Sequence, residues 1–233
     1  MTQFPLGEEL AEGQLRSAAS LPFKPAPVVL AGRFVRLEPL DLARDLQALF
    51  EVSNGQPVSL GDRSVGAYDA DALIWRYLFK GPFDNAEALG EFLGDIAATP
   101  NFLPFTVFDV ATGRAIGFAA YTNNTPAHLK IELGHIWYSP VVQRTNANLE
   151  STYLMLGHAF ALGYRRVEWK CDALNERSRR SALRMGFSFE GIQEAHFIVK
   201  GRNRDTAWFR MLDRAWPAVR RQLEAMLYGF GET

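Results

Sequence analysis

The hydrophobic positions in the middle of the chain repeat first as in a strand and then as in a helix. Residues 131–138 read as a strand that Ser139-Pro140 ends, and a polar stretch follows over residues 141–148. Apolar residues then recur with a spacing of four, three and four, which predicts a helix: Leu149, Tyr153, Leu156 and Phe160. The free N–H groups where such a helix begins suit a phosphate, although a plain strand-to-helix connection explains the pattern equally simply.

The chain before this stretch predicts helices beside a hairpin. A strand over residues 33–37 leads into a helix over residues 42–52, for which Asp41 is the N-cap. A loop rich in glycine, proline and serine covers residues 53–68. Two helices follow over residues 70–79 and 85–98. Two apolar runs, 102–110 and 114–121, predict a hairpin whose turn contains Gly113.

The chain after this stretch predicts three strands and two helices. Residues 165–172 alternate Val167, Trp169 and Cys171 with Glu168, Lys170 and Asp172, which predicts a strand with one face near solvent. A helix over residues 175–185 ends at Gly186. The remaining elements are a strand over 187–200, a turn over 201–204, a strand over 206–212 and a helix over 217–228.

The order of these elements predicts an α+β fold, a mixed and mostly antiparallel sheet with helices on both faces. We expect residues 1–31 to form an N-terminal arm packed on the surface, with a short helix over residues 8–19. Residues 32–233 show no internal repeat, no low-complexity tract and no point of division. They are therefore expected to form a single domain.

Composition and charge exclude several classes of function. The 233 residues are 48% hydrophobic, enough for a sizeable core, and a net charge of −1 argues against binding nucleic acid or an acidic membrane. The single cysteine, Cys171, rules out an internal disulfide and a cysteine-based zinc cluster. No apolar run approaches the roughly 20 residues that span a bilayer, and the first residues lack a secretory signal. A cytoplasmic protein is expected.

Several stretches of this chain resemble a known family. They are VFDVATGRAIGFAAY, IELGHIWYSP, the loop that opens the following helix, and NERSRRSALRMGFSFEG. Together they resemble the GCN5-related N-acetyltransferase (GNAT) superfamily, in particular the branch of ribosomal-protein N-acetyltransferases and their small-molecule-modifying relatives. The resemblance covers about residues 32–213. It implies direct transfer of an acetyl group from acetyl-CoA to a primary amine of a small molecule or a protein N-terminus, without a metal.

In this family the pyrophosphate of coenzyme A is held by a Q/R-x-x-G-x-G/A loop. The matching residues are Gln143, Arg144, Thr145, Asn146, Ala147 and Asn148, so asparagine replaces both small residues. Asparagine tolerates a left-handed φ, but its side chain could crowd the phosphates. Arg144 could pair with a phosphate or be a solvated surface arginine. The resemblance also implies cofactor contacts at Tyr138, Asn175 and Ser178.

The resemblance implies two catalytic residues. Glu132, placed by alternation on the strand face of Gly134, Ile136 and Tyr138, is expected to act as general base through a water molecule. The alternative is a structural carboxylate paired with a neighbouring strand. The helix position that holds a tyrosine acid in many members is Ala182 here, so Ser178 or a water is the candidate for protonating the thiolate. Asn175 and Ser178 fit a simple helix cap equally well.

Other residues have simpler explanations. Cys171 is expected in the core, and the scattered histidines lack metal-ligand spacing. One or two of the arginines at 177, 179, 180 and 184 could reach the 3′-phosphate of coenzyme A, although such a run is usually a solvated face. Trp75, Tyr77, Phe79 and Phe83 would line the acceptor cleft or pack in the core. The absent tyrosine acid and the two asparagines leave a second hypothesis, a non-catalytic acyl-CoA-binding or interaction module. A homodimer through the arm or the final hairpin is a further expectation.

Overall fold

The computed structural model describes residues 6–229, so the ends of the predicted arm and domain, residues 1–5 and 230–233, lie outside the described residues. The helices are α1 (Glu12–Ser20), α2 (Leu42–Glu51), α3 (Ala86–Ala98), α4 (Ala147–Ala161), α5 (Glu176–Arg184) and α6 (Trp216–Tyr228), with short turns η1 (Asp71–Trp75), η2 (Pro126–His128), η3 (Pro140–Val142) and η4 (Asp213–Ala215). The strands are β1 (Leu30–Ala31), β2 (Val35–Pro39), β3 (Val58–Leu60), β4 (Arg63–Val65), β5 (Leu103–Asp109), β6 (Ala115–Thr125), β7 (Lys130–Tyr138), β8 (Arg166–Asp172), β9 (Ser188–Val199) and β10 (Arg202–Leu212).

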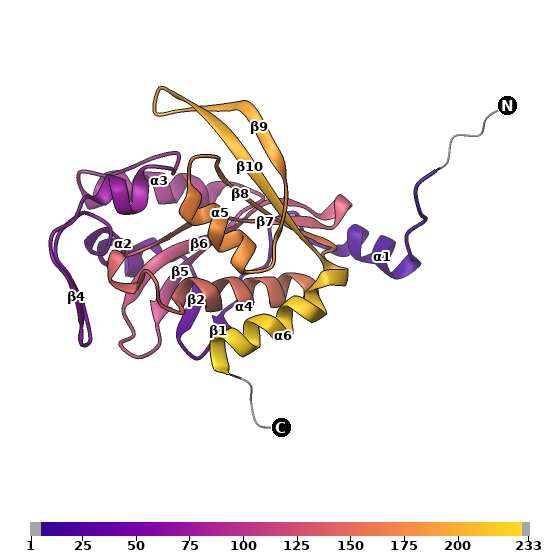
Figure 1. Cartoon of the computed structure of the whole chain (residues 1–233), viewed down its shortest axis with the longest axis horizontal. Coiled ribbons are helices and arrows are strands. Elements are labelled where there is room, and N and C mark those ends of the chain that lie inside the picture. The colour runs from indigo at the N-terminus through magenta and orange to yellow at the C-terminus, as the bar shows by residue number, and fades with distance from the viewer. Residues whose placement is uncertain (1–5, 230–233) are drawn as a thin grey trace.

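Eight strands form one sheet in the order β1-β2-β5-β6-β7-β8-β10-β9, and β3 and β4 form a separate hairpin (Figure 1). Each neighbouring pair in the large sheet is antiparallel except β7 and β8, which are parallel. Helix α2 lies on one face, where Thr106 donates to Asp45, and α4 lies on the other, where the Tyr121 hydroxyl donates to the Met155 carbonyl. The predicted α+β fold with helices on both faces is confirmed.

Local sequence signals begin and end the helices as expected. Asp41 accepts from the N–H groups of Ala43 and Arg44 at the start of α2, and Asn85 accepts from Ala88 at the start of α3. Each cap satisfies N–H groups that have no partner within the helix. Gly186 follows α5 with φ +89°, the left-handed conformation that ends a helix at little cost in glycine.

One sequence prediction of local structure is wrong, and a second holds with one exception. The helix expected over residues 70–79 is only the short π-type turn η1, in which the buried Trp75 indole donates to the carbonyl of Ser53. Strand β8 follows the predicted alternation, since Val167, Trp169 and Cys171 are buried on one face, whereas Lys170 and Asp172 on the other are partly exposed. Glu168 is the exception, because it lies on the second face and is buried. Its carboxylate pairs with Arg166 at 2.7 Å and Lys130 at 3.6 Å. A carboxylate that is paired in this way can be buried on a strand face that is otherwise partly exposed to solvent.

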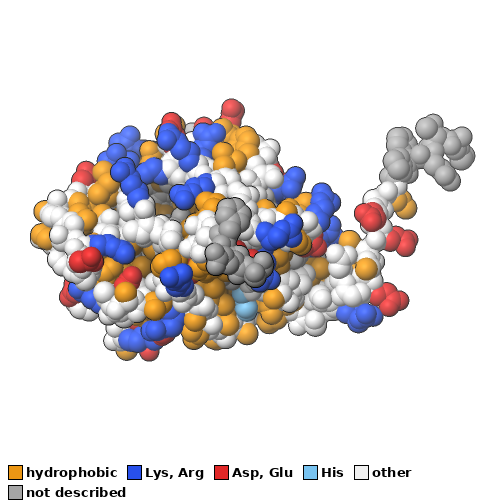
Figure 2. Space-filling view, turned by 60° about the horizontal axis from the view of Figure 1, so that its bottom comes forward, with side chains coloured by type: hydrophobic (Ala, Val, Ile, Leu, Met, Phe, Trp, Pro, Cys, Tyr) orange, Lys and Arg blue, Asp and Glu red, His pale blue; other side chains and the backbone are white. Residues whose placement is uncertain are grey.

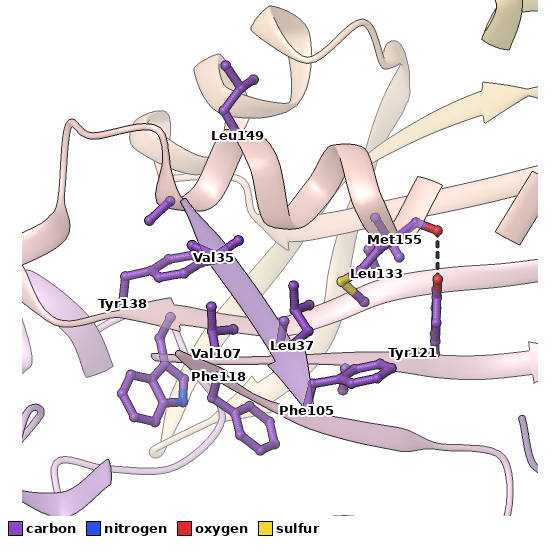
Figure 3. Close-up of a cluster of buried hydrophobic side chains, with 14 of the residues drawn as sticks. Val35, Leu37, Phe105, Val107, Phe118, Tyr121, Leu133, Tyr138, Leu149 and Met155 are labelled. Carbon is purple, nitrogen blue, oxygen red and sulfur yellow. Dashed lines mark hydrogen bonds between the residues drawn. The ribbon is translucent and has the colours of Figure 1, made fainter. Parts of the chain in front are cut away.

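The core between α4 and the sheet contains large apolar side chains from most of the strands (Figure 3). Leu37, Phe105 and Met155 are all inaccessible to solvent, and Tyr121 is held there by its hydrogen bond to α4. Burial of this apolar surface is the main source of stability and fixes α4 against the sheet. The stretch that connects β7 to α4 is therefore attached to rigid elements at both ends.

The predicted N-terminal arm contacts the rest of the chain at several points. Helix α1 contributes no buried residue and lies toward the right of Figures 1 and 2, where it contacts the turn η2. Farther along the arm, Asn124 donates to the carbonyls of Pro22 and Phe23. Residues Leu30–Ala31 pair with β2 as part of the large sheet. The division of the chain into an arm and a domain stays a prediction.

Candidate active site

Strands β7 and β8 separate partway along their length, and this separation creates the site. Their pairing runs from Lys130–Arg166 to Leu133–Trp169 and then stops. Just beyond, the pairs Ala120–Gly134 and Phe118–Trp137 enclose one more residue in β7 than in β6, and His135 has φ +54°. These are the features of a β-bulge, which bends a strand away from its neighbour. Backbone groups after Leu133 in β7 consequently have no partner in β8.

The bulge also corrects the predicted orientation of β7. Glu132, Gly134 and Trp137 share one face, because they pair with alternate residues of β6, whereas Tyr138 lies on the opposite face. The prediction that Tyr138 shares the face of Glu132 is therefore wrong, since the extra residue reverses the alternation. The Tyr138 ring is buried beside Val35 in the core (Figure 3). Its expected contact with a cofactor stays a prediction.

A first cavity of about 420 Å³ opens on the side of the bulge that carries Glu132. Its lining combines several aromatic residues with polar ones, and the charged side chains among its lining residues are those of Glu132, Lys170 and Arg204. Tyr77 and Phe79, two of the four aromatic residues singled out in the sequence, lie in its wall. Trp75 instead packs against Phe83 with ring centroids 5.1 Å apart. The aromatic set is therefore divided between cavity and core.

Glu132 is buried at the floor of the first cavity and is held by two partners. Lys170 lies 2.6 Å from its Oε2 atom, and the Asn123 amide donates to the same atom at 2.8 Å. Burial raises the pKa of Glu132 even though Lys170 and Asn123 act in the opposite direction. The carboxylate is thus both paired with the neighbouring strand and exposed to the cavity. The predicted pairing with a neighbouring strand is confirmed, and the role of general base stays a prediction.

Sequence reasoning missed two residues of the first cavity, His135 and Arg204. Burial, together with the charges of Arg204 and Lys170, lowers the pKa of His135 to about 4, so the ring is neutral at neutral pH. The Arg204 side chain lies with its guanidinium carbon 4.4 Å from the centre of the Phe79 ring. His135 belongs to the bulge, and Arg204 lies in a part of β10 that the sequence pattern assigned to a turn. Neither position carried a recognisable motif.

A second cavity of about 750 Å³ lies on the other side of the separated strands, between β7, α4 and α5. Arg144, Arg177, Arg180 and Arg184 line it, and its lining contains no aspartate or glutamate. The last three follow a spacing of three and four along α5 and so share one face of the helix. Arg179 lies elsewhere, where it donates to the Ala173 carbonyl. The cavity is suited to a ligand with several negative charges.

Four of the residues predicted to hold the pyrophosphate border the second cavity, three from the loop between η3 and α4 and one from the first turn of α4. Gln143, Arg144, Thr145 and Asn148 line the cavity, whereas Asn146 and Ala147 are absent from its walls. The left-handed residue is Arg144, with φ +64°, and Asn146 has φ −75°, so no asparagine supplies the turn as the sequence suggested. The Asn148 side-chain oxygen is buried with no hydrogen-bond partner among the described residues.

The two cavities meet at four shared residues, which we call the junction: Ile136, Trp169, Asn175 and Ser178. Asn175 caps α5 by accepting from the Ser178 N–H at 3.1 Å, and the Trp169 indole donates to the Ser178 hydroxyl oxygen at 3.0 Å. The helix-cap interpretation of Asn175 is confirmed. The Ser178 hydroxyl, whose oxygen accepts from Trp169, can also donate its proton, and the neighbouring Cys171 sulfur is one group that it can donate to.

Cys171 is buried beside the junction and also lines the first cavity. Burial raises the pKa of its thiol, which keeps it protonated and weakly nucleophilic. Ala182, at the helix position where the resemblance leads one to expect a tyrosine acid, is fully buried, and its methyl group cannot donate a proton. Within residues 6–229, no group of three or more histidine, cysteine, aspartate or glutamate side chains is arranged to hold a metal ion. In the same range, no helix is long and apolar enough to cross a bilayer.

Comparison with known proteins assigns the chain to a family. The model of the acetyltransferase (GNAT) domain matches residues 35–188, which include β7, the loop, α4, β8 and α5. The chain belongs to the GNAT N-acetyltransferase family. Membership implies the use of acetyl-CoA to acetylate an amine, and the substrate is not established by it. The comparison with curated proteins gave no match.

Solved structures agree with this assignment. A GCN5-related N-acetyltransferase from Brucella melitensis is 38% identical with a TM-score of 0.78, covering 88% of this chain and 87% of that one. A probable GNAT-family acetyltransferase from Chromobacterium violaceum is 34% identical with a TM-score of 0.77, covering 93% and 100%. An acetyltransferase from Salmonella typhimurium that modifies the N-terminal serine of ribosomal protein L7/L12 is 15% identical with a TM-score of 0.65, covering 79% and 99%. The last likeness concerns the fold alone.

Proposed function

We propose that this protein transfers the acetyl group of acetyl-CoA directly to a primary amine at the junction of the two cavities. The observation that carries the proposal is the junction itself, where an arginine-lined cavity meets a cavity that contains a buried carboxylate. An acetyl-CoA thioester and an amine that enter from opposite sides would meet there. Direct transfer depends chiefly on holding the two reactants in line.

The lining of the second cavity supports the binding of coenzyme A there. Arg177, Arg180 and Arg184 would pair with its phosphates, and the start of α4 would direct N–H groups at the pyrophosphate. The edge of β7 beyond Leu133, which has no partner in β8, would hydrogen bond the amides of the pantetheine arm. Asn148 has an unpartnered buried oxygen that could accept a donor from the same ligand. The asparagine substitutions are therefore compatible with this ligand.

Glu132 and Ser178 would carry the proton transfers. Glu132 would take a proton from the entering ammonium through a water, and its raised pKa makes it a better base than an exposed glutamate. Ser178, with its oxygen already accepting from Trp169, would relay a proton: it would donate its own to the departing thiolate and regain one from the attacking nitrogen, which loses its extra proton as the C–S bond breaks. Lys170 would hold Glu132 in place and stabilise its charged form. Each step needs only residues that the two cavities bring together.

The acceptor is a small molecule or a protein N-terminus, since both present a primary amine. The enzyme should therefore be assayed by release of free CoA from acetyl-CoA with a panel of amino acids, amino acid amides, polyamines and peptides with N-terminal serine. We expect turnover with at least one class and a loss of roughly 10²- to 10⁴-fold in kcat for Glu132→Gln. Tight acetyl-CoA binding in calorimetry without turnover would instead support a non-catalytic acyl-CoA-binding module. Absence of both would refute the proposal.

A further inference from the structure

Arg204 is a buried cation that projects into the first cavity without an anionic partner. Only 6% of its surface is exposed. Among the described residues no carboxylate lies within ion-pair distance of its guanidinium, and its buried Nε atom has no hydrogen-bond partner. A buried guanidinium without a partner is costly, because its desolvation is not offset. Such a group is expected where a ligand supplies the missing anion.

The charges around the first cavity also indicate an anionic ligand. Glu132 and Lys170 form an ion pair at 2.6 Å and neutralise each other, which leaves Arg204 as the uncompensated charge among the lining residues. His135 faces the same space but is neutral, since burial lowers its pKa to about 4. Asp172 and Glu132 lie near enough to raise the pKa of Arg204, yet burial outweighs them and lowers it overall. The lining residues of the cavity therefore carry a net positive charge, which a ligand with one negative charge would neutralise.

The surroundings of Arg204 fix the orientation of its guanidinium. Its guanidinium carbon lies 4.4 Å from the ring centre of Phe79 and 5.7 Å from that of Phe197. The aromatic contacts hold the planar group without using its N–H donors. A guanidinium with free donors matches the two oxygens of a carboxylate. Thr206, fully buried in the same wall, has a hydroxyl without a partner and could add a further hydrogen bond.

We propose that the acceptor of this enzyme is an apolar primary amine that also carries a carboxylate, which Arg204 binds. The inference rests on the proposed function, because it assigns the first cavity to the acceptor. Apolar and aromatic residues of the walls, among them Phe79, Phe102 and Phe197, would surround the side chain of the acceptor. Aromatic and large aliphatic α-amino acids combine these three features.

The test compares each amino acid with its carboxamide, which has nearly the same shape but no negative charge; the variants below control for the lower basicity of the amine in the amide. We would measure kcat/KM by CoA release for phenylalanine, tryptophan, leucine and methionine against their amides. The wild-type enzyme should prefer the acid of at least one pair by about 10- to 100-fold, the effect of a bidentate charge-assisted contact. Arg204→Gln should bring the acid-to-amide ratio close to one, and Arg204→Lys should give an intermediate ratio. Arg202→Gln, which removes an exposed arginine from the same strand, should leave the ratio unchanged.

Two results would overturn the inference. One is a wild-type ratio near one or in favour of the amides, and the other is an acid preference that survives in Arg204→Gln. Calorimetry with N-acetyl-L-phenylalanine and its amide measures binding without turnover. It therefore distinguishes failure of this inference from failure of the proposed function. Binding of the acid alone, lost in Arg204→Gln, would support the carboxylate site even if no amine were turned over. Absence of both binding and turnover would refute both proposals.

Discussion

The carboxylate of Glu150 joins three parts of the chain that lie far apart in sequence. Its Oε1 atom accepts from the Arg33 N–H at 2.9 Å and the Tyr228 hydroxyl at 2.7 Å. Its Oε2 atom accepts from the N–H groups of Phe34 at 2.6 Å and Val35 at 2.8 Å. Glu150 is inaccessible to solvent and lies in the first turn of α4. The contacts bind β2 and α6 to the helix whose start borders the second cavity.

The substitution Glu150→Gln should destabilise the protein strongly. The amide nitrogen cannot accept, so at the Oε1 position it would face the Arg33 N–H, although the Tyr228 hydroxyl could turn to accept from it. Hydrogen bonds to a charged group contribute about 1.5–3 kcal/mol each, so the loss of at least one gives a decrease of about 1.5–3 kcal/mol or more in the free energy of unfolding. Urea unfolding followed by circular dichroism would measure this difference as a lower midpoint at an unchanged m-value. Acetyl-CoA affinity should also fall, because the start of α4 loses its anchor.

A matched control tests the reasoning behind this magnitude. Glu224 also accepts from a tyrosine hydroxyl, that of Tyr153 at 2.7 Å, and pairs with Arg220 at 2.8 Å, but it lies near the surface. The substitution Glu224→Gln should therefore cost less than about 1 kcal/mol. Equal losses for the two variants, or a loss below about 1 kcal/mol for Glu150→Gln, would show that the buried network does not stabilise the fold as argued.

Three further predictions follow from single contacts. Gly32→Ala should lower stability by about 1–3 kcal/mol in urea unfolding, because a Cβ there would overlap the Glu150 carboxylate; an unchanged midpoint would contradict this contact. Arg184→Gln should weaken acetyl-CoA binding in calorimetry by roughly tenfold, whereas Arg179→Gln should not, since Arg184 lines the second cavity and Arg179 does not; equal effects would argue against phosphate binding there. The kcat of the wild-type enzyme should fall as pH decreases through a pKa above 4.5, because burial raises the pKa of Glu132 and protonation removes the base. Glu132→Gln should abolish this decrease of kcat at low pH. If the variant retained the decrease, another group would be responsible for it.

The sequence was sufficient where local patterns determine structure. The caps at Asp41, Asn85 and Asn175 follow from side chains that bond N–H groups within three residues, so they can be recognised without knowledge of the fold. The predicted helix at α4 also follows from a local spacing of apolar residues. The order of elements and the motifs then led to the family to which the chain belongs.

The rest of the site depends on contacts between distant segments. The bulge at His135 reverses the face of Tyr138, and no residue near it marks the extra position in the strand. The buried ion pair of Glu132 with Lys170 joins two strands that are neighbours only in the sheet. Arg204 reaches the first cavity because β10 begins four residues earlier than its apolar pattern suggested. Such arrangements are set by tertiary packing, which an alternating pattern does not encode.

The most direct test of the account is a crystal structure of the protein with acetyl-CoA. The account predicts phosphates against Arg177, Arg180 and Arg184, the pantetheine arm along the free edge of β7, and the thioester at the junction within reach of Ser178. A complex with the thioester outside the junction, or with the phosphates away from these arginines, would contradict it.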